Sequence, residues 1–377
     1  MALTLHGTVS DNTVALDRKT ATPLIINGDM AIAQRGTSAT TIGNGNSGYH
    51  VCDRWRFSEQ GDPTGEFTIS QSTDVPTGQG FVNSLKFDVT TSDTLLSSEF
   101  FRFEHRTEAQ DMKVLKYGTS SAETSTLSFW VKSNKTGDYA ISIRQSDDNR
   151  SLTKTYTINS ADTWEKKIIN IPADTTGVID NDNGIGLHFY WYFDAGSDYT
   201  GTTQTTWGAY ADGMTANGHA VTLLDSTDND WYITGVQLEV GTFDADSIPP
   251  FQFEDRGTSL MRCMRYTQCF GGNNNKETFC SGGCNTTTIQ TMLIEHKTEM
   301  RTTPSVSVSA LNDFQVVVPS GFTSAPTAIT LATDNSGPTA STITTNTTSQ
   351  AASQVGRYCN LRCVDVTNGK LTLSAEL

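Results

Sequence analysis

The sequence predicts an all-β protein: a jelly-roll β-sandwich, then a short linking helix, then a second, smaller β-sandwich. Three observations predict this class. Short segments in which apolar and polar residues alternate recur along most of the chain, which is the pattern of half-buried strands. Gly, Asn and Ser, which favour turns, separate these segments. A helical spacing of apolar residues occurs near residue 260, and 377 residues suffice for about two domains.

The composition supports the same class and limits the possible partners. Charged residues are only 18% of the chain, while 17 Phe, 11 Tyr and 6 Trp supply large rings to fill each sandwich. This is typical of an extracellular or structural β protein rather than a helical enzyme rich in Lys and Glu. The net charge of -15 repels nucleic-acid phosphates and anionic lipid, so we expect neither nucleic-acid binding nor membrane insertion. Residues 1–6 contain no basic region and no long apolar run, so we expect no signal peptide.

Residues 1–23 are short, polar and rich in Thr, and two interpretations remain open for them: an extended arm that attaches to a larger assembly, or a disordered terminus. The first domain is predicted over residues 24–250, and Asn27-Gly28 is a strong tight-turn signal near its start. Its strands are expected where apolar residues alternate with polar ones, at residues 67–69, 85–89, 127–131, 139–143, 156–158, 169–171, 185–193 and 231–240.

Residues 251–269 are predicted to link the two domains. Leu260, Cys263, Met264 and Thr267 follow helical spacing, so we expect a short helix over residues 259–268. The second domain is predicted over residues 270–377. Its clearest strands are expected at residues 306–308, 316–318, 329–331, 364–366 and 371–373. The Thr- and Ser-rich tract 332–353 is interpreted as a long surface loop or a set of weak strands.

Several segments, in their order and spacing, resemble a family of tail fibre and virion structural proteins of tailed bacteriophages. The strand at 233–241 is among the best matches, and Phe253-Glu-Asp-Arg256 and Cys263-Met-Arg-Tyr266 resemble the segments that follow it in the family. The other similar segments are residues 24–36, 53–55, 126–133, 156–159, 163–165, 300–304 and 374–377. The resemblance covers residues 24–268 well and the remainder loosely. It implies a jelly roll like that of carbohydrate-binding modules, carried on the virion, often as a homotrimer, with a tip that contacts the host and without a catalytic centre.

The aromatic strand at residues 185–193 is the first candidate binding site. Its odd-numbered residues are predicted to face the core, which leaves His188, Tyr190 and Tyr192 on the other face. Such rings can stack on the apolar faces of sugars, so these three residues form a candidate sugar platform. The alternative is that both faces of the strand are covered.

The acidic runs 147–149 and 180–184 offer carboxylate and amide oxygens, the ligands that calcium prefers. By resemblance, jelly-roll modules of this kind hold structural calcium. Neither run matches an EF-hand loop, and a solvated turn is the alternative. We otherwise expect no cofactor and no metal.

Six of the seven cysteines follow residue 262: Cys263, Cys269, Cys280, Cys284, Cys359 and Cys363. A phage protein folds in a reducing cytoplasm, so thiols are the first expectation, disulfides formed after release the second and a metal site the third. Cys52 is expected to be a small buried hydrophobic residue.

The sequence contains no nucleophile elbow, phosphate-binding loop or zinc-protease motif, so we expect no enzyme. The predicted function is a structural virion protein, a tail fibre or receptor-binding component made without a signal peptide. The arm (1–23) would bind other tail proteins, and the tip (270–377) would bind a host glycan or protein. The alternatives are a head fibre or decoration protein, and a tailspike that cleaves glycans.

Overall fold

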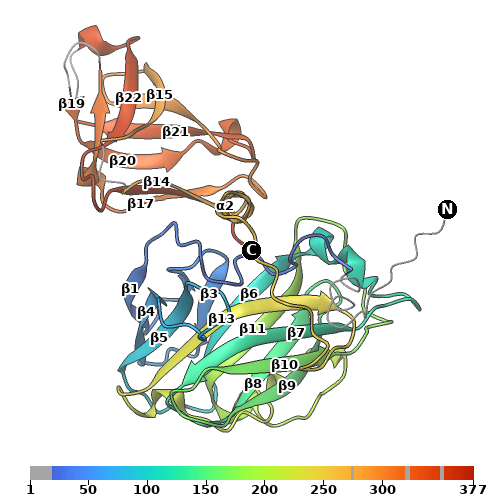
Figure 1. The fold of residues 1–377 in the computed structure, drawn as a ribbon. Coiled ribbons are helices and arrows are strands. Elements are labelled where there is room, and N and C mark those ends of the chain that lie inside the picture. The colour runs from blue at the N-terminus through green and yellow to red at the C-terminus, as the bar shows by residue number, and fades with distance from the viewer. Residues whose placement is uncertain (1–18, 273–275, 319–322, 349–351) are drawn as a thin grey trace, which may run out of the picture. The chain divides into compact units, whose positions relative to one another are not determined.

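Two units, divided after Asp255, make up the chain. A computed structural model describes residues 19–272, 276–318, 323–348 and 352–377. Both units consist of antiparallel strands paired in sheets (Figure 1), which confirms the predicted all-β class. Most of the predicted arm, residues 1–18, lies outside the described residues. Lys19 Nζ bonds Glu123 Oε2 at 2.8 Å, and the carbonyl of Ala21 accepts from Gln252 Nε2 at 2.7 Å.

Sheet A of unit 1 has β13 at its centre, although this is the last strand of the unit. In Figure 1 the yellow β13 lies between β5 and β7, and it pairs with both. The strands of sheet A, in spatial order, are β1 (Ser38–Gly43), β4 (Glu66–Ser72), β5 (Ser84–Thr91), β13 (Asp230–Val240), β7 (Ser125–Ser133) and β10 (Glu165–Ile171).

Sheet B of unit 1 is centred on the long strand β11. Its strands, in spatial order, are β12 (Gly208–Ala209), β9 (Arg150–Ile158), β8 (Gly137–Gln145), β11 (Ile185–Ala195), β6 (Phe100–Glu108), β3 (Trp55–Gln60) and β2 (Gly48–Tyr49).

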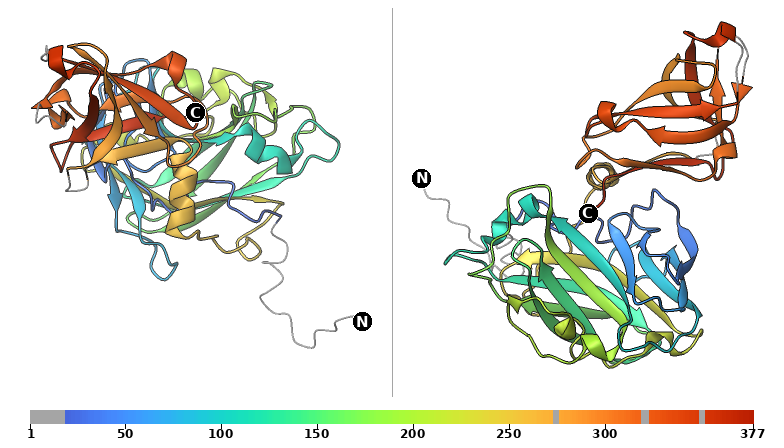
Figure 2. Two further views of the ribbon diagram at one scale, coloured as in Figure 1. Left: turned by 90° about the horizontal axis from the view of Figure 1, so that it is seen from above. Right: turned by 180° about the vertical axis from the view of Figure 1, so that it is seen from behind.

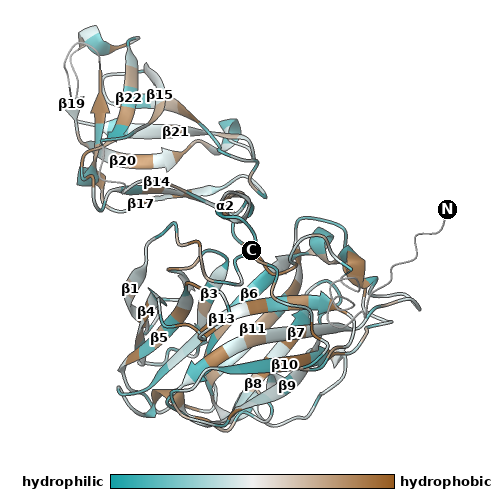
Figure 3. Ribbon diagram, viewed as in Figure 1, coloured by the Kyte–Doolittle hydropathy of each residue, from teal (hydrophilic) through white to brown (hydrophobic). Residues whose placement is uncertain are grey.

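Sheets A and B pack face to face through large aromatic residues. Phe87 of sheet A lies 5.0 Å from Phe103 of sheet B, measured between ring centroids, and Trp231 lies 5.1 Å from Phe193. All four rings are fully buried. Apolar and polar bands therefore alternate along the strands (Figure 3), because one face of each sheet fills the core.

Unit 2 is a second, smaller sandwich, as predicted. Sheet C contains β14 (Thr267–Gly271), β23 (Lys370–Ser374) and β17 (Ser305–Val308). Sheet D contains, in spatial order, β19 (Thr323–Ser324), β18 (Phe314–Val317), β22 (Tyr358–Cys363), β15 (Thr278–Cys284), β16 (Ile289–Glu295), β21 (Ala340–Thr347) and β20 (Pro326–Leu331). Leu371 and Leu373 of sheet C share a core with Phe314 and Leu361 of sheet D.

The predicted helix and two predicted strand features differ in detail. Helix α2 (Arg256–Met264), the yellow-orange coil in Figure 2, begins three residues earlier than predicted. Thr267 already belongs to β14. The strand predicted at 364–366 is a turn, because Asp365 Oδ1 accepts bonds from the backbone N–H groups of Thr367 and Asn368. The Thr-rich tract contains β21, whose alternate residues are buried, so one part of it is a strand.

The remaining helical elements are single 3-10 turns or short runs: η1 (Ala109–Leu115), η2 (Ser197–Tyr199), η3 (Asp212–Met214), η4 (Leu223–Asp225), η5 (Leu311–Asp313), η6 (Thr333–Asn335) and η7 (Ala352–Gln354). Across the described ranges, no helix has both the length and the apolar character that crossing a membrane requires.

Candidate functional site

A pocket of about 160 Å³ lies on the outer face of sheet A, and all of its residues belong to unit 1. Strands β7, β10 and β13 form its floor, and the segments around residues 80 and 251 form its walls. The lining residues are Gln79, Phe81, Ser128, Trp130, Lys166, Gly235, Gln237, Pro250, Phe251 and Phe253.

Strand register places the polar and aromatic side chains of the floor side by side. Gln237 of β13 lies directly opposite Ser128 of β7, and Trp130 of β7 lies opposite Lys166 of β10. Residues two apart on a strand share a face, so Ser128 and Trp130 project on the same side of the sheet. The inward neighbours Leu127, Phe129 and Val131 are fully buried in the core, which fixes this orientation.

A bulge in β13 makes room for the first wall. The register of β13 against β7 shifts between Thr234 and Gln237, and Gly235 has φ 63°. A Cβ atom on Gly235 would lie 2.5 Å from the ring of Phe81. Only glycine therefore allows the Phe81 ring to lie directly on the strand. The bulge also changes which residues of β13 face the core. Before the bulge these are the odd-numbered residues Trp231 and Ile233, and after it they are the even-numbered residues Val236 and Leu238.

Three phenylalanine rings make up the aromatic wall. Ring centroids are 5.1 Å apart for Phe81 and Phe251, 5.2 Å for Phe81 and Phe253, and 4.8 Å for Phe251 and Phe253. Phe81 is buried, whereas 48% of Phe253 is exposed. The wall is thus anchored at one end and open to solvent at the other.

Two buried polar atoms of the floor are unusual, because buried polar groups normally form hydrogen bonds. Gln237 Nε2 donates to the carbonyl of Pro249 at 2.9 Å, which fixes the amide. Within the described ranges, neither Gln237 Oε1 nor Ser128 Oγ has a hydrogen-bond partner. Burial also lowers the pKa of Lys166. The pocket therefore offers a fixed acceptor, a hydroxyl and an ammonium group beside an aromatic wall.

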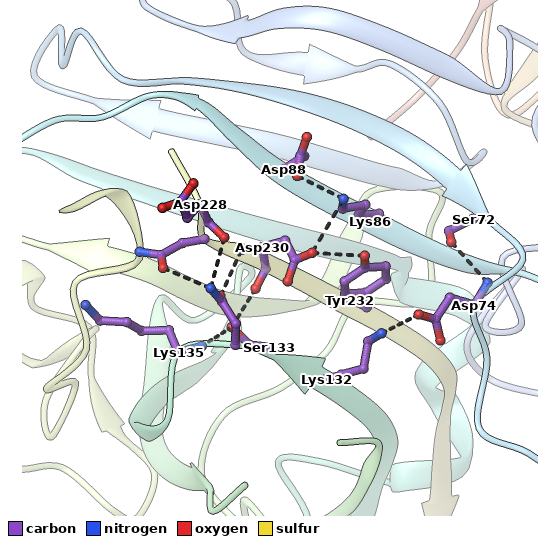
Figure 4. A network of polar contacts seen from close by, with 12 residues as sticks. Ser72, Asp74, Lys86, Asp88, Lys132, Ser133, Lys135, Asp228, Asp230 and Tyr232 are labelled. Carbon is purple, nitrogen blue, oxygen red and sulfur yellow. Dashed lines mark hydrogen bonds and ion pairs between the residues drawn. The ribbon is translucent and has the colours of Figure 1, made fainter. Parts of the chain in front are cut away.

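Lys132, two residues after Trp130 on β7, begins a polar and aromatic strip on the same face of sheet A. Figure 4 shows Lys132 with Asp74, Asp230 and Tyr232 of this strip. Lys132 Nζ lies 4.2 Å from the ring centroid of Tyr232, and the Tyr232 hydroxyl donates to Asp230 Oδ2 at 3.0 Å. Trp164 packs edge-on against Tyr232 at 6.1 Å and donates its Nε1–H to Asp74 at 2.9 Å. Burial first, and then the charge of Asp230, raises the pKa of Tyr232 to about 12. These contacts hold the rings of the strip in place.

The predicted sugar platform is wrong in this structure, because its three residues are covered. His188, Tyr190 and Tyr192 are 6%, 2% and 0% exposed. Tyr199 and Ala216, from the segment that follows β11, form one apolar cluster with Tyr190 and Tyr192. His188 Nε2 forms a hydrogen bond with Ser146 Oγ at 2.7 Å. The alternative, that both faces of the strand are covered, describes the structure.

The two acidic runs lie beside each other in loops. Asp147 Oδ2 accepts from the backbone N–H of Asp180, and Asp148 Oδ2 from that of Val178. Burial and the negative charges of Asp180, Asp182 and Asp148 raise the pKa of Asp147. Among the residues that the structure describes, no group of three or more His, Cys, Asp or Glu side chains is placed to hold a metal ion.

The cysteines are thiols in this structure. Cys280, Cys284, Cys359 and Cys363 are buried in unit 2, Cys263 is buried in α2, and Cys269 is half-buried in β14. Burial first, and then the neighbouring Cys284, raises the pKa of the Cys359 thiol to about 12. Cys52 is buried in the core of unit 1, where Met30 and Trp55 also lie.

The residues of the sheet A pocket were not among the sequence candidates. One signal was available: Ser128 and Trp130 alternate with the core residues of β7, so an outward tryptophan was visible in the sequence. The Phe wall gave no signal, because residues 251–253 were interpreted as the start of the linker and Phe81 lies outside any predicted strand.

Comparison with protein-family models and with curated protein sequences gave no match. Solved structures with a similar fold include the enzymatically active domain of tailspike protein 4 of bacteriophage CBA120, at 13% identity and TM-score 0.27, covering 50% of this chain and 19% of that one. A family 11 carbohydrate-binding module of a Clostridium thermocellum cellulase matches at 13% identity and TM-score 0.26, covering 55% of this chain and 96% of the module. A xylan-binding domain from Paenibacillus barcinonensis matches at 16% identity and TM-score 0.28, covering 53% and 97%. Likeness at this level assigns no ligand and no residue role.

Proposed function

We propose that this chain is a glycan-binding structural protein of a tailed-phage particle, and that unit 1 binds sugar in the sheet A pocket. The chemistry of the pocket supports the proposal. Phe81, Phe251 and Phe253 form an aromatic wall. Beside it lie two buried polar atoms, Gln237 Oε1 and Ser128 Oγ, which have no hydrogen-bond partner among the described residues. Aromatic faces pack on the C–H faces of pyranoses, while a fixed amide and hydroxyl bond sugar hydroxyls. At about 160 Å³ the pocket is smaller than the roughly 300–1,000 Å³ of sites for drug-sized ligands, so it fits a single sugar ring.

The virion part of the proposal rests on the sequence resemblance over residues 24–268. In this proposal the chain is a tail fibre or receptor-binding protein, located on the virion, homotrimeric and without catalytic activity. Residues 1–23 attach it to other tail proteins. Three weak sites on one trimer would give an avidity that exceeds the single-site affinity by about 10²–10⁴.

The test is binding of the purified full-length chain to an array of neutral host-envelope glycans, followed by calorimetry with the best ligand. Trp130→Ala and Gln237→Ala should each weaken binding at least about tenfold, as loss of an anchoring contact does. Tyr358→Ala is the matched control, because it removes an exposed ring from unit 2. Unchanged glycan binding in both pocket variants would exclude the pocket, and absence of binding by the parent chain would exclude glycan recognition.

A further inference from the structure

The outer face of sheet B carries a cluster of arginines around one buried carboxylate. Glu104 of β6 lies directly opposite Arg56 of β3. Arg56 Nη1 donates to Glu104 Oε1, Arg106 Nη2 reaches the same oxygen at 3.0 Å, and Arg102 Nη2 lies 3.8 Å from Oε2. Burial alone would raise the pKa of Glu104, but Arg102, Arg106 and Arg56 outweigh it and lower the pKa to about 2.

The cluster has more positive than negative charge. Arg144 of β8 lies opposite His188, which lies opposite Arg106, so this fourth arginine is on the same face. The four arginines Arg56, Arg102, Arg106 and Arg144 and the carboxylate of Glu104 leave a charge of 4 − 1 = +3. Burial lowers the pKa of His188 to about 3, so this imidazole is neutral and does not change the sum. A surplus of +3 is notable in a chain of net charge -15.

Two of the arginines are held rigidly and still have unused donors. The guanidinium of Arg102 lies 3.8 Å from the ring centroid of Tyr190 and donates to the Tyr192 hydroxyl at 3.2 Å. Arg144 lies 4.1 Å from the ring centroid of Tyr210 and donates to Asn149 Oδ1 at 2.8 Å. Over the part of the chain that the structure describes, the Nε–H groups of both have no hydrogen-bond partner.

The surroundings of the cluster favour an anion at the exposed parts of the guanidinium groups. The side chains of Arg56, Arg102 and Arg106 are 23%, 14% and 19% exposed, so the guanidinium groups are largely desolvated and a ligand can contact only their exposed parts. The Nε–H groups of Arg102 and Arg144 are themselves buried. A planar guanidinium stacked on a ring is preorganised to bind a carboxylate or phosphate through parallel hydrogen bonds. The half-buried ring of Tyr210 beside Arg144 adds an apolar surface for a sugar.

We propose that this arginine cluster binds the oxyanion of an acidic saccharide, that is, a carboxylate or an ester phosphate or sulfate carried on a sugar. The inference rests on the proposed glycan-binding function and adds a second site to it, on the other sheet of unit 1. The two sites would bind sugars of different charge: the sheet A pocket binds a neutral sugar ring, and the sheet B cluster binds an acidic one.

The test is calorimetric titration of the full-length chain with glucuronic acid, glucose 6-phosphate, glucose 6-sulfate, inorganic phosphate and glucose. We expect the three acidic sugars to bind at low salt, glucose not to bind at this site, and inorganic phosphate to compete with the acidic sugars. Arg144→Gln should weaken binding of the acidic sugars about tenfold, the loss expected for one charge-assisted hydrogen bond. Arg362→Gln, which removes the same charge from unit 2, should leave it unchanged.

Glu104→Gln separates a binding role from a structural one. Removing the central negative charge should strengthen acidic-sugar binding severalfold. If the arginines only stabilise the fold, the same substitution should not increase the affinity for acidic sugars. If Glu104→Gln does not fold, the Arg144→Gln comparison decides. Binding of inorganic phosphate without any binding of the acidic sugars would overturn the proposal, as would equal effects of Arg144→Gln and Arg362→Gln. Trp130→Ala should leave acidic-sugar binding intact, so failure of this site and failure of the sheet A pocket are distinguishable.

Discussion

The outer faces of sheets A and B both carry rows of aromatic side chains, yet the two faces are built differently. On sheet A, Trp130 and Phe253 border a pocket that is open to solvent. On sheet B, Tyr190 and Tyr192 lie beneath the segment after β11. The difference shows that alternation identifies which rings point outward, while the connections between strands decide which of them solvent reaches. Substitutions on the two faces should therefore differ in their effect on stability.

The first prediction compares one ring from each face. Tyr192→Ala should lower the free energy of unfolding of unit 1 by about 3–5 kcal/mol, because it leaves a cavity under the covering segment. Trp130→Ala should lower it by less than about 1 kcal/mol, because that ring is half-buried at a pocket edge. All six tryptophans lie before residue 256, so tryptophan fluorescence during urea unfolding reports on unit 1. Equal losses in the two variants would contradict the contrast.

The second prediction concerns the bulge that builds the sheet A pocket. Gly235→Ala should cost about 2–4 kcal/mol, since it combines a left-handed backbone with a contact at 2.5 Å to Phe81. Gly78→Ala is the matched control: its φ is 78°, but nothing lies within 4 Å of the added carbon. Its cost should stay near 1–2 kcal/mol, roughly the backbone contribution alone. Urea unfolding measures both, and similar losses would show that the Phe81 contact is unimportant.

These two cases also show how far the sequence leads. The all-β class and the strands around Leu127, Phe189 and Leu238 follow from alternation, because each strand buries one face. The bulge at Gly235 does not follow, since a glycine within a strand pattern does not reveal which ring will approach it. The sequence also does not predict that the segment after β11 covers Tyr190. The residues of this segment are rich in Gly, Thr and Asp, and no local pattern indicates that Tyr199 and Ala216 pack against the strand. Contacts between segments far apart in the sequence determine which side chains a ligand can reach, and the local sequence pattern does not reveal these contacts.

The third prediction uses a buried carboxyl at the end of β11. Burial raises the pKa of Asp194 to about 7, against 3.8 for the ordinary group. The folded state therefore favours the protonated acid, so this group's contribution to stability is full below about pH 3.8 and is lost as pH rises toward 7. Asp194→Asn should stabilise unit 1 by about 1–2 kcal/mol at pH 8, because one pKa unit is about 1.4 kcal/mol and the new amide must find a partner.

Unfolding measured from pH 4 to pH 8 checks this prediction. The parent chain should lose more stability across that range than the Asn variant, which keeps an acceptor for the backbone N–H of Ala195. A steeper loss in the variant would show that Asp194 is ionised in the folded protein.

The last and smallest effect belongs to the exposed carboxylate of Asp74, in the strip on the outer face of sheet A. The Asp74 carboxylate pairs with Lys132 and accepts a hydrogen bond from Trp164 Nε1. Burial alone would raise the pKa of Asp74, but these contacts outweigh burial and lower the pKa. Its contribution is therefore present above the ordinary pKa and is lost as pH falls, the opposite sign to Asp194. Asp74→Asn should cost less than about 1 kcal/mol, since the Asp74 side chain is 46% exposed to solvent, and the cost should shrink in 0.5 M NaCl. The Asp194→Asn gain should persist in the same salt, because its origin is burial rather than a screened pair. If salt changed both variants alike, the pH dependence at Asp194 would come from a screened charge pair and not from burial.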